Sequence, residues 1–156
     1  MEEIGMAISG PLSKEVITIG TSVEERKLLV RMLRVMYPHS RFPDGPYERT
    51  ADAVIAAGNT TPGQALTFAA GLRELQAASF GDLDDAAATT YLEGMAGSPF
   101  FALVHGRAVV ALYNDHEVWE LLGYEGPSFD KGGYLNRGFN DLDWLPDPRI
   151  TELDRG

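Results

Sequence analysis

The sequence predicts an all-α protein in which a bundle of about five or six short helices, over residues 1–123, is followed by an irregular arm, over residues 124–156. Helix-start signals recur along the first part, each a capping residue placed just before an apolar pattern with helical spacing. Glycine and proline mark the ends of these segments. From Tyr124 onward, evenly spaced aromatic residues among glycines and prolines replace the helical pattern. No linker or internal repeat divides the chain, so we expect one domain with an ordered arm.

The first predicted helix begins at a capping box, in which Ser22 and Glu25 satisfy each other's backbone N–H groups. Pro38 ends this helix, because the residue before a proline disfavours the helical conformation. Its apolar side follows helical spacing through Leu29, Met32, Leu33 and Met36. Residues 1–20 are expected to form an extended N-terminal arm or to contain one short strand, because residues 16–19 are all β-branched.

Two more helices follow a predicted loop. Residues 39–46 have turn chemistry, with two prolines and an Asp-Gly pair. A second helix is predicted over residues 47–57, with Gly58 as its C-terminal cap. Thr61 predicts the start of a third helix, because proline follows it at the first helical position and glutamine lies three residues on. This helix is expected to run to about Ala78.

The fourth and fifth helices also have clear start signals. Acidic residues within 82–85 suit the positive end of a fourth helix that runs to about Ala96. Ser98 then precedes a proline, which predicts an apolar fifth helix over residues 100–112. Because this segment is apolar on most sides, we expect it to be the central and most buried helix.

A short sixth helix is predicted between Asn114 and Gly123. Asn114 and Glu117 have the spacing of a capping box, and Gly123 is a typical C-terminal cap. The apolar residues of this segment are Val118, Trp119, Leu121 and Leu122.

The arm has a repeat that fits neither regular structure. Its aromatic residues lie five apart, at Tyr124, Phe129, Tyr134, Phe139 and Trp144. Five residues turn a helix by about 500°, and an odd spacing on a strand sends successive rings to opposite faces. Disordered segments are poor in large aromatic residues. We therefore expect an ordered but irregular arm in which each ring occupies its own pocket.

Two interpretations of the arm remain open. In the first, the arm packs back over its own bundle and completes the core. In the second, its rings anchor in another protein's pockets, while its acidic groups steer the encounter toward a basic surface. Residues 115–156 carry ten acidic and four basic side chains, which gives −6 of the chain's net charge of −10. We favour the second interpretation, with these candidate partner-binding residues: Trp119, Tyr124, Phe129, Tyr134, Phe139 and Trp144.

Catalytic chemistry finds little support in the sequence. His105 and His116 would share a face of one unbroken helix, but the capping box at Asn114 separates them, and His39 lies far away in the chain. We expect His105 to be a buried or half-buried helix residue rather than a metal ligand. Ser22 and Ser98 have the context of helix caps rather than of nucleophiles. The sequence thus predicts no catalytic residue and no metal site.

Composition and charge exclude other classes of function. There is no cysteine, which rules out disulfides, iron–sulfur clusters and thiolate zinc sites. A net charge of −10 opposes binding to nucleic acid or to an anionic membrane surface. No segment approaches the roughly 18 apolar residues of a membrane span, so membrane insertion is not expected. The chain as written begins without a secretion signal, which predicts a cytoplasmic protein, or a periplasmic one if a signal was removed or the complex is exported.

A distinctive pattern runs through Phe100-Phe101, Leu112-Tyr113-Asn114-Asp115, Val118-Trp119, Leu121-Leu122-Gly123-Tyr124 and Gly126-Pro127. Over about the last third to half of the chain, this pattern resembles the C-terminal half of the gluconate 2-dehydrogenase subunit 3 family, which comprises small subunits of flavin-dependent dehydrogenases. The tryptophan with its Leu-Gly-Tyr and Gly-Pro companions is the most specific part. The sequence lacks the Arg-Arg pair of a twin-arginine signal, and residues 114–117 replace the glycine-rich stretch usual before the tryptophan.

The resemblance implies a non-catalytic, chaperone-like accessory subunit that binds, stabilises and helps to mature or export a larger FAD-dependent dehydrogenase of sugars or other alcohols. The FAD would belong to the partner, and this chain would bind no cofactor. A small helical metal-dependent enzyme that uses His105 and His116 is one alternative. Another is a homo-oligomer that buries the arm in its own symmetric interface.

Overall fold

The computed structural model describes residues 21–133 and residue 135, and within that part the chain forms α-helices and 3-10 turns with no strand. This architecture confirms the predicted all-α bundle. The helices are α1 (Val23–Met36), α2 (Asp44–Gly58), α3 (Pro62–Ala77), α4 (Asp85–Met95), α5 (Pro99–Tyr113) and α6 (His116–Leu122), and the 3-10 turns are η1 (Phe80–Asp82) and η2 (Phe129–Lys131). The stretch 16–19, with its predicted strand or extended arm, lies outside the described residues.

Side-chain caps begin helices where the sequence predicts them. At α1 the Ser22 hydroxyl accepts from the Glu25 N–H at 3.1 Å, and the Glu25 carboxylate accepts from the Ser22 N–H at 2.7 Å. Oxygens of Thr61, Asp84 and Ser98 cap α3, α4 and α5 through the N–H three residues on. These local signals are sufficient because a cap involves only neighbours in the sequence.

The second helix departs from the prediction at both ends. It begins at Asp44, so the last three residues predicted as loop form its first turn. Proline is tolerated there because the first N–H groups of a helix have no intrahelical acceptor. Gly58 is the last helical residue, and Asn59 follows as the cap. Gly58 instead permits a close contact, because an added Cβ would lie 2.7 Å from Cγ of Phe68.

The predicted capping box at Asn114 is wrong. Asn114 ends α5, and its N–H donates to the carbonyl oxygen of Val110 at 3.1 Å. Asp115 caps α6 instead, because its carboxylate accepts from the Glu117 N–H at 3.0 Å. The fifth helix continues through Tyr113, one residue beyond its predicted end, and this moves the next cap by one position.

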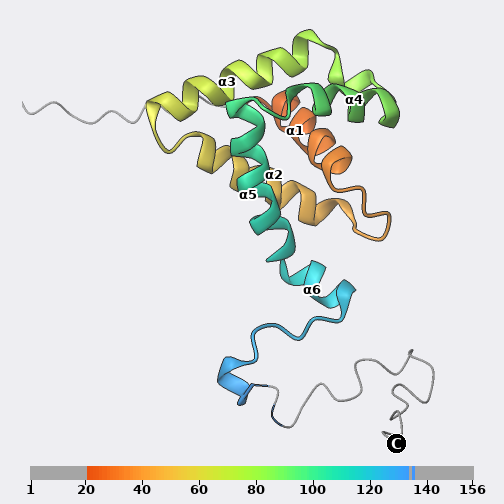
Figure 1. The fold of residues 1–156 in the computed structure, drawn as a ribbon, viewed down its shortest axis with the longest axis vertical. Helices are drawn as coiled ribbons and strands as arrows, with labels where there is room; N and C mark the ends of the chain where they lie inside the picture. Colours follow the sequence, from red (N-terminus) through yellow and green to blue (C-terminus); the bar gives the residue numbers. More distant parts are fainter. Residues whose placement is uncertain (1–20, 134, 136–156) are drawn as a thin grey trace, which may run out of the picture.

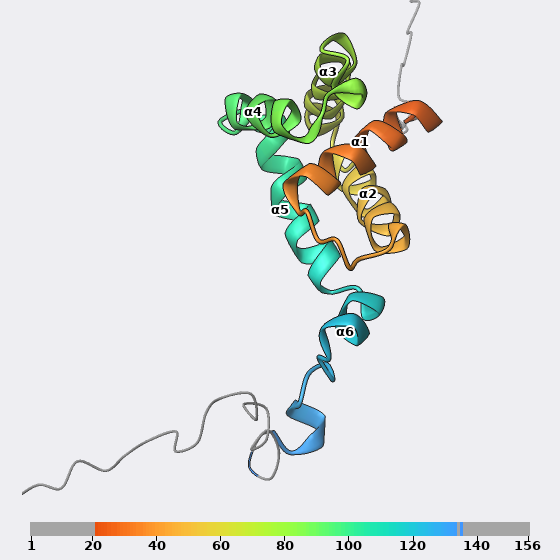
Figure 2. The ribbon, with the colours of Figure 1, turned by 90° about the vertical axis from the view of Figure 1, so that its right-hand side faces the viewer.

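The bundle is built around the contact between α2 and α5, which cross each other in Figure 1 and lie next to each other in Figure 2. Helix α1 packs on α2, α3 and α4, and α3 packs on α5. The larger buried side chains of the core are Leu29, Met32, Leu33, Phe42, Tyr47, Val54, Phe68, Leu72, Leu75, Phe80, Leu92, Met95, Phe100, Val104, Leu112 and Val118. Their concentration on α1–α5 shows that these helices bury their apolar sides against one another.

Helix α5 is central but is not the most buried helix. It contacts α2, α3 and α6. Its buried residues form one stripe of four, through Phe100, Val104, Ala108 and Leu112, whereas α2 buries six residues. Val109 and Val110 lie on its exposed side. Within the described residues no single helix is long and apolar enough to cross a membrane, although α4 and α5 together pass that test across a break bent by 113°.

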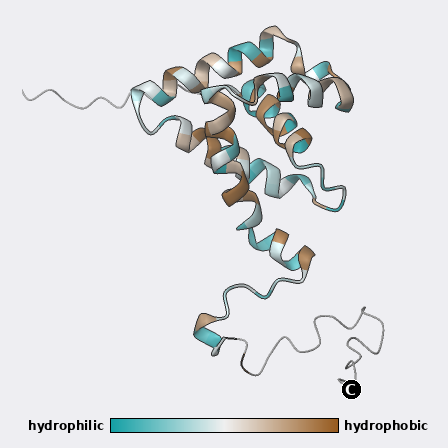
Figure 3. Cartoon of the chain, in the orientation of Figure 1, coloured by the Kyte–Doolittle hydropathy of each residue, from teal (hydrophilic) through white to brown (hydrophobic). Residues whose placement is uncertain are grey.

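The last described part of the chain leads away from the bundle. Figures 1 and 2 show α6 at the far end of α5, followed by a segment that extends from it and includes the turn η2. Between Tyr124 and Gly133 this turn is the only regular element, which agrees with the predicted irregular arm. Figure 3 shows apolar residues on α6 and on this segment, far from the apolar core.

Candidate functional site

The end of α6 brings two aromatic rings together. Gly123 has a left-handed φ of 73°, its N–H donates to the carbonyl oxygen of Glu120 at 3.2 Å, and the Tyr124 N–H donates to that of Trp119 at 2.8 Å. These two bonds form a Schellman motif, in which the residue after the glycine commonly contacts the last turn of the helix. Here the rings of Tyr124 and Trp119 meet edge to face, with centroids 5.2 Å apart. Gly123 thus ends α6 as predicted and also places the first ring of the arm.

Trp119 is held by three further contacts. Its Nε1 donates to the carbonyl oxygen of Tyr113, at the end of α5, over 2.7 Å. The imidazole of His116 stacks on it, with centroids 4.6 Å apart and an angle of 16° between the rings. Gly126, at a φ of +85°, lies so close that an added Cβ would be 3.3 Å from the indole. Trp119 therefore connects α5, α6 and the arm. We call Trp119, together with its contact residues Tyr113, His116, Tyr124 and Gly126, the frame of the arm.

Large apolar side chains at the end of α6 and in the arm are exposed to solvent. Leu122 is 59% exposed and Tyr124 46%, while Phe129 and Leu135 reach 95% and 83%. Trp119, Tyr124 and Phe129 line an open hollow of about 630 Å³ between α6 and η2. Exposed apolar residues gathered on one short segment are typical of a surface that contacts another molecule.

Half of the predicted partner-binding residues can be located. Trp119, Tyr124 and Phe129 line one hollow, and the first two are in direct contact. The other three predicted anchors, Tyr134, Phe139 and Trp144, lie outside the described residues. The two described rings of the arm, Tyr124 and Phe129, therefore share one hollow with Trp119 rather than each occupying a pocket of its own.

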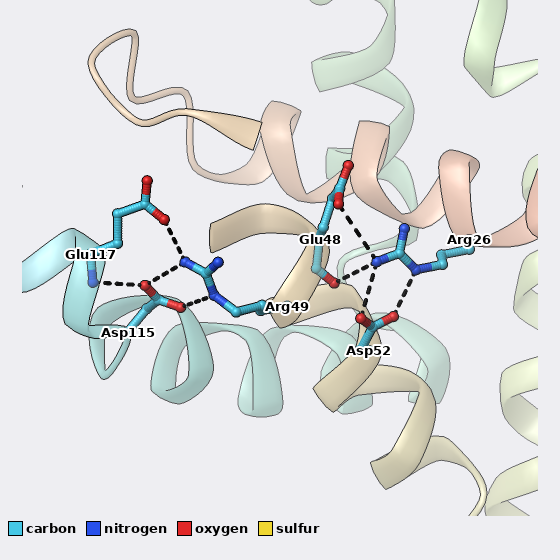
Figure 4. Close-up of polar contacts among 6 residues, drawn as sticks. All are labelled: Arg26, Glu48, Arg49, Asp52, Asp115 and Glu117. Carbon is cyan, nitrogen blue, oxygen red and sulfur yellow. Dashed lines mark hydrogen bonds and ion pairs between the residues drawn. The ribbon is translucent and has the colours of Figure 1, made fainter. Parts of the chain in front are cut away.

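An arginine from α2 holds the start of α6 in place (Figure 4). Arg49 donates two hydrogen bonds to the Asp115 carboxylate, at 2.7 and 2.9 Å, and one to the Glu117 carboxylate at 2.6 Å. The Asp115 side chain is 10% exposed. The hydrogen bonds and charge of Arg49 hold the pKa of the Asp115 carboxyl below its ordinary value, although burial acts in the opposite direction. The cap of α6 and the tie to the bundle thus depend on the same carboxylate.

A second contact supports the end of α5. The His39 Nε2 lies 2.6 Å from the hydroxyl oxygen of Tyr113, the residue whose backbone carbonyl accepts from Trp119. Tyr37 meets the Tyr113 ring edge to face, with centroids 6.0 Å apart. The loop between α1 and α2 is therefore connected, through Tyr113, to the frame of the arm.

The predicted state of His105 is wrong. His105 lies exposed on α5, where it stacks on Phe101 with centroids 6.1 Å apart, because the buried stripe of this helix runs along its other side. His116 stacks on Trp119 instead, so each of these histidines has its own aromatic neighbour. No group of three or more His, Asp or Glu side chains that could hold a metal ion forms in the part of the chain described above.

Several residues that position the arm were not predicted from the sequence. Arg49 and Asp115 lie 66 residues apart, and no local pattern pairs them. Asp115 had one detectable signal, because aspartate is as good a cap as asparagine and occupies the neighbouring position. No sequence signal indicated the contacts of Tyr113, since one of them is made by its backbone carbonyl, a group that every residue has.

In comparisons with known proteins, no family model, no curated protein and no solved structure matches the chain.

Proposed function

We propose that this chain is a non-catalytic small subunit that docks its C-terminal arm on a larger protein. The observation that carries the proposal is the exposure of Tyr124 and Phe129 on a segment that leads away from a bundle with a core of its own. Aromatic side chains of this kind supply much of the binding energy in protein interfaces. The rigid connection through Trp119 adds to this, because a surface held in one conformation loses less entropy on binding.

We further propose that the partner is an FAD-dependent dehydrogenase of sugars or other alcohols, which the chain stabilises and helps to mature or export. The support is the pattern of Trp119, the Leu-Gly-Tyr sequence and the Gly-Pro pair. In the structure these residues have a shared role: Gly123 ends α6, Tyr124 contacts Trp119, and Gly126 packs on the indole. The pattern that resembles subunit 3 of gluconate 2-dehydrogenase is thus the pattern that builds the frame of the arm. The FAD belongs to the partner in this proposal.

Affinity purification from the source organism tests both parts. The full chain and a chain that ends at Gly123 are used as baits, and circular dichroism first establishes that both are helical. We expect a flavin-containing protein to copurify with the full chain and to be absent with the shortened one. A shortened chain that remains folded and still retains the partner would refute docking through the arm. A copurifying partner without flavin would refute only its identity as a flavoprotein.

Point variants of the full chain separate the arm from general surface effects. Phe129→Ala is expected to weaken partner binding by about 2 kcal/mol. Leu66→Ala is the matched control, because Leu66 is 64% exposed on α3 and lies outside the arm. Native mass spectrometry of the purified chain addresses the alternative of self-association. A stable oligomer that dissociates on Phe129→Ala would show that the arm binds a second copy of this chain.

A further inference from the structure

The hollow between α6 and η2 is lined by both aromatic and acidic residues. Trp119, Tyr124 and Phe129 supply the rings, and Glu120, Glu125 and Asp130 supply carboxylates. We infer that this hollow binds an arginine side chain presented by a protein partner. The inference rests on the proposed function for the source of that side chain, and it specifies the chemistry that the partner must offer.

The walls can accommodate a flat cation. Guanidinium groups stack on the faces of aromatic rings, where the negative quadrupole of the ring attracts them. Phe129 is 95% exposed, so its faces are accessible, and Tyr124 is 46% exposed. Trp119 is fixed by Tyr113 and Tyr124 and does not need to move to form one side of the hollow.

The charge of the lining favours a cation over an apolar side chain. Three carboxylates and one ammonium, from Lys131, leave a net charge of −2 among the acidic and lysine residues of the lining, which also includes His116. The Lys131 Nζ donates to the backbone carbonyl oxygen of Glu125 at 3.1 Å. The side chains of Glu120 and Asp130 form no ion pair with any other described residue. An apolar occupant would remove water from these carboxylates without replacing its hydrogen bonds.

Arginine suits this arrangement better than lysine. Its planar group can stack on a ring while its N–H donors bind carboxylates at the edge, whereas a lysine ammonium is a point charge with a tightly held water shell. The bundle already uses arginine in a related way, because Arg34 lies over the ring of Tyr47, with its Cζ 4.2 Å from the centroid, and forms an ion pair with Asp44.

A peptide titration of the full chain tests the inference. The probe is a capped peptide of four arginines, and the control probe replaces each arginine with citrulline, its uncharged isostere. The readout is the indole N–H signal of Trp119 in a ¹H–¹⁵N NMR spectrum, identified with the Trp144→Phe variant. We expect a saturable shift of this signal with the arginine peptide and none with the citrulline peptide.

Charge-matched variants decide whether the hollow is the site. The double variant Glu120→Gln, Asp130→Asn should weaken arginine-peptide binding by about fivefold or more. The control pair Glu74→Gln, Glu93→Gln removes the same charge from exposed positions of α3 and α4 and should change binding by less than about twofold. Equal losses in both pairs, or a Trp119 signal that does not move, would overturn the inference.

The arginine site and docking through the arm can fail independently of each other. If shortening the chain at Gly123 abolishes partner binding while the arginine peptide leaves Trp119 unaffected, docking through the arm stands and the arginine site is wrong. If the arginine peptide binds the hollow while the shortened chain retains the partner, the arginine site stands and docking through the arm is wrong.

Discussion

The bundle and the arm use aromatic residues in opposite ways. Tyr47 and Phe80 are fully buried in the bundle, where each contacts side chains from other elements. Tyr124 and Phe129 in the arm are 46% and 95% exposed. A buried ring stabilises the fold by the apolar area it removes from water, whereas an exposed ring leaves that free energy available for a contact with another molecule. The core is thus complete without the described part of the arm.

The two regions also differ in how they use charge. In the bundle, arginines are paired with carboxylates of other helices, as in the pairs Arg26–Asp52, Arg31–Asp85 and Arg49–Asp115. Arg26 holds α1 on α2 through Asp52 and the Glu48 carbonyl, as Figure 4 shows beside the Arg49 contacts. On α6 and the described arm, Glu120 and Asp130 have no such partner among the described residues. Charge in the bundle therefore joins helices, whereas these two carboxylates are exposed to solvent.

Truncation of one ring in each region gives the largest expected difference. Phe100→Ala should lower the free energy of unfolding by about 3–5 kcal/mol, because it leaves a cavity beside Phe68. Phe129→Ala should change it by less than about 0.5 kcal/mol, since the ring has almost no contacts to lose. Urea unfolding followed by circular dichroism measures both. A loss above about 1 kcal/mol for Phe129→Ala would mean that the arm belongs to the folding unit of the bundle.

Substitution of two glycines by alanine tests how tightly the helices are packed at each position. An added Cβ at Gly71 would lie 2.0 Å from Cγ of Phe100, so Gly71→Ala should cost about 1–3 kcal/mol by displacing that ring. Gly94 in α4 has no heavy atom within 4 Å of the corresponding position. Gly94→Ala should therefore stabilise the helix by about 0.5–1 kcal/mol. Thermal unfolding should show a lower stability for Gly71→Ala and a higher stability for Gly94→Ala. A loss of stability in Gly94→Ala would contradict the prediction.

The sequence predicts the helices because their ends are local events. Caps such as Ser22, Thr61 and Ser98 act on the N–H three residues on, and a reader of the sequence can find them. The close contacts at Gly58 and Gly71 depend on Phe68 and Phe100, which come from other helices, so the same glycines give no such signal in the sequence.

The frame of the arm was predictable only in part. The end of α6 at Gly123 follows from local chemistry, and so does the contact of Tyr124 with the preceding turn. The exact start of α6 is harder, because Asn114 and Asp115 are adjacent and equally good caps, and the length of α5 decides between them. The choice of Arg49 as the partner of Asp115 is set by how α2 lies on α5, which only the assembled bundle determines.

Removal of the arginine that joins the two regions should have a smaller and more local effect. Arg49→Met should loosen α6, because the Asp115 carboxylate loses the cation that offsets its burial, and amide exchange in α6 should speed up by about tenfold, or about 1.4 kcal/mol. The unfolding of α1–α5 should change by less than about 1 kcal/mol. Arg26→Met is the control, because its ion pair joins α1 to α2 and should leave exchange in α6 unchanged.

The smallest expected effect is on pH dependence. In the folded protein, Arg49 lowers the pKa of Asp115 below its ordinary value of 3.8. The pKa of Asp115 is lower in the folded protein than in the unfolded one. The stabilisation of α6 by the Arg49–Asp115 ion pair is therefore fully present above pH 3.8 and is lost as the pH falls through the folded pKa. NMR titration of the Asp115 carboxyl carbon should give a midpoint below 3.8 that rises toward that value in Arg49→Met.

Asp52 supplies the internal reference for this titration. Arg26 lowers its pKa through a hydrogen bond of the same kind, at the contact between α1 and α2. The Asp52 midpoint should therefore stay depressed in Arg49→Met, while that of Asp115 moves. If both midpoints rise, the substitution has loosened the whole bundle. If neither rises, backbone N–H groups of α6 rather than Arg49 hold the Asp115 charge, and the cap of α6 is then independent of its tie to α2.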